Sequence, residues 1–352
     1  MEGNGAVQTA VGSVDLKGKI WGESKIVWSI ILPTVVARVT SYSTSLVTQV
    51  WIGHINKVEL AAFGLIMSVL VLFTNGIILG MSSATETFCG QAFGAKQNNM
   101  MGIYLQRSWI VNVATVTILL SVSSGVMLCL ELWYQAILVL LAGYLDDATV
   151  EISAFSFCMT INSLEFMICL SFLSAACIRV ANELGRGNEE AAMFSVKVIL
   201  TNSLIIGILF SILFLVFGKD IPRLLTSDIE VQEAMADLSY LLSISFLFNS
   251  IQPVFTGVAV GSGLQGRVAI INICCYYLVG LPVGLLLGFL ANWGIKGLWI
   301  GLLLGIAVQT MVLGLMIWRT NWQEQVDKVS NRLNQWLLEP STENDEASVP
   351  SS

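Results

Sequence analysis

Long apolar stretches recur along this chain of 352 residues and are separated by short polar segments. A helix that crosses the roughly 30 Å hydrocarbon layer of a bilayer needs about 20 mostly apolar residues. The ten-residue alternation of an outer-membrane barrel is missing from the pattern, which therefore predicts membrane-spanning helices. Eight stretches qualify, near residues 27–50, 60–83, 109–144, 152–176, 195–218, 237–260, 268–290 and 297–318.

The third stretch is too long for one straight span. Residues 109–144 would form about 54 Å of helix at 1.5 Å per residue, and the tilt that fits them into a bilayer exceeds the usual range of about 0–40°. Two spans and a turn would need more than about 42 residues. We therefore expect one span with about a dozen surplus residues on one side.

Composition supports a membrane protein. Only 12 % of the residues are charged and 55 % are hydrophobic, whereas soluble domains carry about 25 % charged residues. This excludes a cytosolic globular protein, and the apolar content excludes a disordered chain. The formal net charge of −7 argues against nucleic acid as a partner.

The segments outside the spans are polar. Residues 1–26 are expected to be a tail without a cleavable signal peptide, residues 321–338 an amphipathic surface helix, and residues 340–352 a disordered acidic tail. With eight spans, twelve of the 17 Lys and Arg residues fall on the side of both termini and four on the other, with Arg38 inside the first span. The positive-inside rule therefore predicts cytosolic termini.

Two loops echo each other in sequence. The first runs from Ser83 to Gln91 and the second from Ser174 to Asn182, so the serine and the amide are eight positions apart in both. Chance matching of small residues is the alternative to a true repeat. Transporters are commonly built from repeats, with the substrate cavity at their interface. If the repeat is real, its first copy is short by about three helices.

Several motifs can be compared with a known family. They are Glu86–Lys96 (ETFCGQAFGAK), Tyr104–Trp109 (YLQRSW), Val126–Tyr134 (VMLCLELWY), Arg179–Gly185 (RVANELG), Gly257–Gly263 (GVAVGSG), Cys275–Tyr277 (CYY) and Gly280–Gly284 (GLPVG). These segments resemble the signature of plant MATE (multidrug and toxic compound extrusion) carriers, and the likeness extends from Glu23 to Trp336. Residues 249–254 (NSIQPV) resemble the subgroup of transparent-testa-type flavonoid carriers.

The resemblance implies an all-α polytopic membrane protein with a two-lobe helical bundle. Family members have twelve helices, and the likeness jumps after about Leu120, in the family's third helix, to about Ser121, at the start of its seventh. About 130 residues would thus be missing, which leaves about eight transmembrane helices. The expected domains are a cytosolic tail (1–26), a truncated N-terminal lobe (27–120), a C-terminal lobe (121–320) and a cytosolic amphipathic and disordered tail (321–352).

Ionisable side chains inside spans are costly and are therefore candidates for function. Glu131 lies mid-span, where low dielectric favours a protonated carboxyl that can exchange its proton as water access alternates. The resemblance implies proton coupling at this position; a permanently neutral, hydrogen-bonded carboxyl is the alternative. Glu165, in the following span, is a second candidate for proton coupling or a structural carboxyl.

Three amides are candidate cavity residues. Asn249 occupies a position where many relatives have an aspartate, and because an amide carries no proton, coupling would depend more heavily on Glu131. Gln252 and Asn162 could hydrogen-bond a polyhydroxylated substrate. Alternatively, they hold helices together, at about 0.6–2 kcal/mol each.

The remaining polar and small residues suggest structural roles. Glu86 is expected to pair with Arg107 or to cap a helix, and Arg38 to have a carboxylate partner or to snorkel. The lone histidine excludes a multi-histidine metal site, and the seven cysteines suggest buried small hydrophobes. Close helix packing is expected at Gly257, Gly261 and Gly263. No Lys-Ser/Thr pair follows these glycines, so ATP is not the predicted energy source.

We therefore expect a secondary antiporter that exchanges protons for organic solutes, either flavonoid glycosides or xenobiotics. It would need no cofactor besides a proton gradient, and its partners would be the bilayer, protons and a small organic substrate. The subgroup likeness favours the vacuolar membrane over the plasma membrane. The alternative is a truncated isoform that does not transport, or that associates with full-length carriers and interferes with them. An enzyme is not expected, since the sequence lacks a catalytic constellation.

Overall fold

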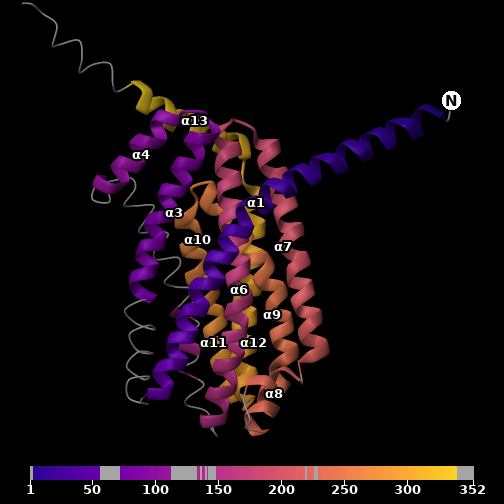
Figure 1. Ribbon diagram of the computed structural model, residues 1–352, viewed down its shortest axis with the longest axis vertical. Coiled ribbons are helices and arrows are strands. Elements are labelled where there is room, and N and C mark those ends of the chain that lie inside the picture. Colours follow the sequence, from indigo (N-terminus) through magenta and orange to yellow (C-terminus); the bar gives the residue numbers. More distant parts are fainter. Residues whose placement is uncertain are drawn as a thin grey trace, which may run out of the picture.

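The computed structural model describes residues 3–55, 72–111, 133–134, 137–138, 141, 148–218, 220–225 and 229–338, and this part of the chain is helical throughout, without strands (Figure 1). The helices are α1 (Gly3–Ile55), α3 (Leu72–Gly94), α4 (Asn98–Val111), α6 (Ala148–Gly185), α7 (Glu189–Phe217), α8 (Ile221–Leu225), α9 (Ile229–Gly261), α10 (Gln265–Asn272), α11 (Leu281–Leu285), α12 (Gly294–Arg319) and α13 (Trp322–Leu338). Two π-helical segments, η2 (Ile273–Gly280) and η3 (Leu286–Leu290), flank α11.

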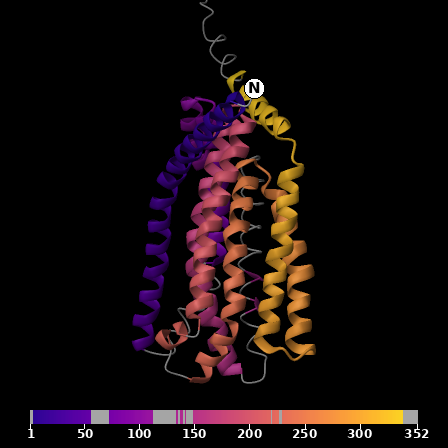
Figure 2. The same ribbon diagram turned by 90° about the vertical axis from the view of Figure 1, so that its right-hand side faces the viewer.

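Six of the eight predicted spans are present as long apolar helices among the described residues, at 16–44, 157–185, 189–217, 232–261, 265–290 and 294–319. Figure 2 shows these helices running side by side along the long axis of the bundle. α3 begins at Leu72 and covers the second half of the stretch at 60–83. The overlong stretch at 109–144 lies largely outside the described residues, including the junction at Leu120 and Ser121. The polytopic helical class is confirmed.

α1 joins the predicted N-terminal tail to the first span in one helix. It begins at Gly3 and continues to Ile55, and its first part projects beyond the bundle (Figure 1). Glu23 attaches it to α6, because Arg179 donates to Glu23 through Nε (2.8 Å) and Nη2 (2.9 Å). Ser195 of α7 donates to the same carboxylate at 2.7 Å. This bidentate ion pair fixes α1 more firmly than a single contact would.

The echoed segments lie in helices α3 and α6 and not in loops, and the two helices pack against each other through equivalent residues, as the predicted repeat requires. A Cβ atom on Gly94 would lie 1.9 Å from the carbonyl oxygen of Asn182, and one on Gly185 would lie 1.9 Å from that of Gln91. The residues that approach are equivalent in the repeat, 91 positions apart. Only glycine permits such contact between two backbones, so each copy supplies the glycine that the other copy needs.

The two echoed helices also end in the same way. In α3 the N–H of Gln97 donates to the carbonyl of Ala92, and in α6 the N–H of Asn188 donates to that of Glu183. The intervening residues have positive φ, 59° at Lys96 and 77° at Gly187. Both ends are Schellman motifs, which satisfy carbonyls at a helix C-terminus.

A third Schellman motif ends α9. The N–H of Leu264 donates to the carbonyl of Ala259, and Gly263 has φ 76°. A Cβ on Gly263 would meet nothing within 4 Å, so the expectation of close packing there is wrong: its φ is what requires glycine. Close packing is confirmed at Gly257 and Gly261, where a Cβ would lie 2.2 Å and 2.5 Å from backbone carbonyl oxygens of α6.

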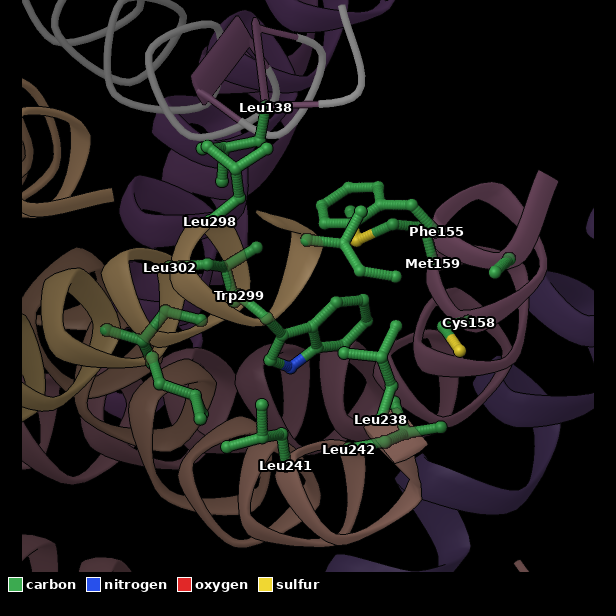
Figure 3. Close-up of a cluster of buried hydrophobic side chains, with 14 of the residues drawn as sticks. Leu138, Phe155, Cys158, Met159, Leu238, Leu241, Leu242, Leu298, Trp299 and Leu302 are labelled. Carbon is green, nitrogen blue, oxygen red and sulfur yellow. The ribbon is translucent and has the colours of Figure 1, made fainter. Parts of the chain in front are cut away.

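The core of the bundle joins α6, α9 and α12. Figure 3 shows the fully buried Trp299 of α12 between leucines of α9 and the side chains of Phe155 and Met159 of α6. Its ring meets Phe155 edge-on at 5.2 Å, and its Nε1 donates to Ser245 of α9 at 3.0 Å. The buried indole N–H is thus satisfied, and these three helices are fixed to each other.

The predicted amphipathic helix is present as α13, which lies at the same end of the bundle as the N-terminus (Figure 2). Val326 and Val329 are buried in a cluster with residues of α6 and α7. On the exposed side, Lys328 pairs with Glu324 at 2.6 Å. This hydrogen bond holds the pKa of the Glu324 carboxyl below its usual value.

Candidate functional site

A buried polar cluster lies between α6 and α9, midway along both helices. It consists of Asn162, Glu165 and Cys169 on α6 and Asn249 on α9. The three residues of α6 follow each other at intervals of three and four, which places them on one face of the helix. Asn249 faces them from the neighbouring helix, so that the cluster joins the two most closely packed helices of the bundle.

Hydrogen bonds connect all four side chains. Asn249 Nδ2 donates to Glu165 Oε2 at 3.0 Å and to Asn162 Oδ1 at 2.9 Å, which uses both of its N–H groups. The thiol of Cys169 donates to the other oxygen of Glu165, with Sγ 2.8 Å from Oε1. Each oxygen of the carboxyl group therefore accepts one hydrogen bond.

Burial and hydrogen bonding act on Glu165 in opposite directions. Its side chain is 1 % exposed, and burial in a medium of low dielectric favours the neutral carboxyl. The two donated hydrogen bonds favour the ionised carboxylate instead. Because these effects oppose each other, the two protonation states are closer in free energy than they would be for an isolated buried carboxyl.

A pocket adjoins the cluster on the side of Asn249. Its lining residues are Tyr134, Phe166, Asn249, Gln252, Tyr276, Leu302 and Ile306. The rings of Tyr134 and Tyr276 stack with centroids 4.8 Å apart and planes within 6°, and Gln252 Nε2 donates to Thr256 Oγ1 at 3.2 Å. The lining combines aromatic faces with two amides, and the cavity that it leaves has a volume of about 10 Å³, which is space for about one water molecule.

A hydrogen-bonded chain supports the far wall of this pocket. The hydroxyl of Tyr276 is hydrogen-bonded to Gln309 Oε1, and Gln309 Nε2 donates to Asn272 Oδ1 at 2.7 Å. Tyr134 donates through its hydroxyl to the carbonyl of Gly301 at 3.1 Å. These bonds hold both tyrosines in place against α12.

Three of the five predicted site residues are brought together, and a fourth lies one turn away. Asn162, Glu165 and Asn249 form the cluster, while Gln252 lines the pocket. Asn162 accepts a hydrogen bond across the helix pair, as the helix-holding alternative predicts. Glu131 lies outside the described residues.

Sequence reasoning missed Cys169. It was grouped with the other cysteines as a small hydrophobe, yet it donates a hydrogen bond to Glu165. The available signal was its spacing of four residues from a carboxyl inside a span, since such residues are neighbours on a helix.

A second polar contact joins α1, α3 and α6. Arg38 of α1 donates through Nη2 to Ser174 of α6 at 3.0 Å, and it interacts electrostatically with Glu86 of α3. A carboxylate near Arg38 is thus present in Glu86, although no ion pair within 4 Å joins the two described side chains. The side chain of Arg107, the partner predicted for Glu86, lies outside the described part.

No metal site is assembled in the described ranges, where no three side chains of His, Cys, Asp or Glu gather closely enough to hold an ion. The arrangement at α6 and α9 places a buried, hydrogen-bonded carboxyl group beside a small cavity lined by aromatic and amide side chains.

Comparisons with known sequences and with solved structures agree on one family. The MatE family profile matches residues 33–124 and 123–286. Two Arabidopsis thaliana proteins, Protein DETOXIFICATION 24 and Protein DETOXIFICATION 21, are each 36 % identical to this chain, over 461 and 456 residues; the alignments cover 94 % and 93 % of this chain and 92 % of each relative. The crystal structure of the eukaryotic MATE transporter AtDTX14 has the same fold, with a TM-score of 0.78 at 23 % identity over 89 % of this chain and 99 % of that chain.

Proposed function

Since the chain belongs to the MatE family of membrane transporters, we propose that it is a secondary active antiporter that moves small organic solutes across a bilayer in exchange for protons. Its relatives are transporters and not enzymes, in keeping with the absence of a catalytic constellation from its sequence. Energy would come from the proton gradient alone.

One observation carries this proposal: Glu165 shares a hydrogen bond with Asn249 at the edge of the pocket. An ionised Glu165 accepts from the amide N–H, which leaves the carbonyl oxygen of Asn249 for a substrate hydroxyl. A protonated Glu165 becomes a donor. If the side-chain amide of Asn249 then rotates, its carbonyl oxygen can accept this hydrogen bond. Proton and substrate would then compete for Asn249, as exchange requires.

The other predicted site residues have roles in the same scheme. Asn162 would hold Asn249 in register, and Gln252 would bind substrate from the next turn of α9. Glu131 is proposed as a second proton site on the strength of the resemblance. Because Asn249 cannot itself take a proton, Glu131 and Glu165 would carry the coupling between them.

The proposed substrates are flavonoid glycosides or xenobiotics. The cavity has space for about one water molecule as it stands, so such a solute would enter only after the lining helices move apart. The aromatic and amide side chains of the lining would then offer stacking and hydrogen bonding to a planar solute with hydroxyl groups. The resemblance of residues 249–254 to flavonoid carriers favours the vacuolar membrane over the plasma membrane.

The competing proposal is a truncated isoform that does not transport, or that interferes with full-length carriers by associating with them. Two observations support an internal deletion. The MatE profile matches the chain in two adjoining segments of unequal length, and the first, with 92 residues, is much shorter than the second, with 164. The alignment to Protein DETOXIFICATION 24 spans 461 positions. It includes 94 % of the 352 residues of this chain, which is about 331 residues. About 130 positions of the alignment therefore have no counterpart in this chain, which is the number that the proposed deletion requires.

Proton-driven uptake into proteoliposomes tests the first proposal. We expect uptake of a flavonoid glycoside to be abolished in Glu165→Gln and in Glu131→Gln. Glu324→Gln on exposed α13 is the matched control and should transport like the wild type. If the wild type shows no uptake while a chain with the missing segment restored from a relative is active, the isoform proposal holds.

A further inference from the structure

The hydrogen bond from Cys169 to Glu165 joins a buried thiol to a buried carboxyl group in the middle of α6. Cys158, Cys169 and Cys177 are all buried on α6, and Cys158 packs in the hydrophobic core around Trp299. Cys169 is 0 % exposed, and its Sγ lies 2.8 Å from a carboxylate oxygen. The thiol therefore contacts the group whose protonation the proposed function requires.

A thiol at this position has two acceptors within reach. A short polar side chain inside a helix commonly donates to the carbonyl four residues earlier, which here is the main-chain oxygen of Glu165. The side-chain carboxylate of the same residue is the second acceptor, and it is the one used in the structure. Rotation about one side-chain bond would move the thiol hydrogen from one acceptor to the other.

The two acceptors suit the two protonation states of Glu165. The ionised carboxylate needs donors, and it has two, the thiol of Cys169 and the amide of Asn249. The protonated carboxyl carries its own hydrogen, so it needs one donor fewer. A thiol that turns to the main-chain carbonyl keeps an acceptor for its hydrogen. A donor that could not turn would be left without an acceptor beside the protonated carboxyl.

We propose that Cys169 is a positioning residue for proton exchange at Glu165: its thiol donates to the ionised carboxylate and turns to the main-chain carbonyl when the carboxyl is protonated. This inference rests on the proposed function of Glu165. No bond between heavy atoms forms or breaks, and the thiol keeps its hydrogen throughout.

Other ionisable groups around α6 do not take this role. α9 presents neutral Asn249 to Glu165, and no charged side chain among the described residues acts on this carboxyl group. On α1, Tyr42 is hydrogen-bonded to Ser163, and Arg38 lies with Ser174, nine residues further along α6. The other described ionisable side chains on elements that pack against α6 lie away from this cluster along their helices. They are Lys17, Lys19, Glu23 and Lys25 of α1, Glu86 and Cys89 of α3, Glu189, Glu190 and Lys197 of α7, Glu230, Glu233, Asp237 and Tyr240 of α9, Lys296 and Arg319 of α12, and Glu324, Asp327 and Lys328 of α13.

The experiment is an infrared titration of the purified full chain in lipid, which needs no transport. The carboxyl band that disappears in Glu165→Gln reports protonation of Glu165. Cys169→Ala removes a donor to the carboxylate, and we expect the midpoint of that band to move to higher pH by about half to one unit. Cys169→Ser supplies a stronger donor and should move the midpoint the other way. Cys158→Ala, which removes a buried thiol elsewhere on α6, should leave it unchanged.

The S–H stretching band provides the second readout. In the wild type, one S–H band should shift in step with the Glu165 carboxyl band, and this shift should be missing from Cys169→Ala and from Glu165→Gln. Equal midpoints in the wild type, Cys169→Ala and Cys169→Ser, with no pH-dependent S–H band, would overturn the inference. A Glu165 band that titrates normally while Glu165→Gln retains full proton-driven uptake would instead refute the proposed function and leave the thiol switch standing.

Discussion

Replacing Asn249 by aspartate would place two carboxyl groups in contact between α6 and α9. The amide nitrogen of Asn249 lies 3.0 Å from Glu165 Oε2, and the substitution puts a carboxylate oxygen in its place. Two unit charges at that distance repel by about 5.5 kcal/mol at an effective dielectric constant of about 20. Since about 1.4 kcal/mol corresponds to one pH unit, ionisation of the second carboxyl group would need a pH about 4 units higher. Relaxation of the structure would make this shift smaller.

We therefore expect Asn249→Asp to hold one shared proton near neutral pH. The single titration of Glu165 in the wild type should become two steps, as for other carboxyl pairs that share a site. The upper step should lie about 2–4 pH units above the wild-type midpoint. Loss of the N–H donor acts in the same direction, because it removes a hydrogen bond from the ionised carboxylate.

Infrared titration of the carboxyl bands measures both steps, with Glu165→Gln identifying the band of that residue. Asn202→Asp is a suitable control, since Asn202 is another hydrogen-bonded amide, on α7, that contacts Trp28 and Ser24 and no carboxylate. It should add a titration step without moving the Glu165 band. An upper step in Asn249→Asp within about half a unit of the wild-type midpoint would show that the two side chains do not meet as described.

Stability measurements in detergent test the packing. Gly185→Ala should lower the free energy of unfolding by about 1–3 kcal/mol through overpacking against the Gln91 backbone. Gly102→Ala is the control: a Cβ there would meet nothing within 4 Å, so this change should be neutral or slightly stabilising. Equal effects of the two substitutions would contradict the contact. Glu23→Gln should cost about 1–3 kcal/mol, because it breaks a buried ion pair but leaves Arg179 its second partner, Glu183, at 3.0 Å. A melting temperature equal to that of the wild type would mean that α1 is held by other contacts.

Much of the fold was predictable because its signals are local. A span of about 20 apolar residues can be recognised from the sequence alone, and the amphipathic pattern of residues 321–338 predicted the helix α13, which begins at Trp322. The repeat was visible in the small residues around Gly94 and Gly185, because a backbone contact that only glycine permits must leave glycine in both copies. Gly263 was misread, since a glycine required by a positive φ looks the same in sequence as one required by packing.

The site itself was predictable only in part. Glu165 and Asn249 were selected separately, but they are 84 residues apart, and which face of α9 meets α6 depends on how the two helices cross. The partner of Glu86 was missed for the same reason: Arg38 is brought near it by the packing of α1 and α3 against α6. The spacing of Cys169 from Glu165 could not predict which acceptor the thiol uses, because the main-chain carbonyl of Glu165 competes with its carboxylate for the same donor.

The position of the cluster separates the two proposals for this chain. All four of its side chains belong to α6 and α9, both of which lie within the second matched segment, 123–286. The proposed deletion falls in the first segment, so it would remove part of the enclosure around a substrate without touching Glu165, the proposed proton-binding carboxyl. A truncated chain that cannot transport should therefore still titrate at Glu165 with its thiol and amide partners. Proton binding without uptake would identify the isoform, and proton binding with uptake would identify the carrier.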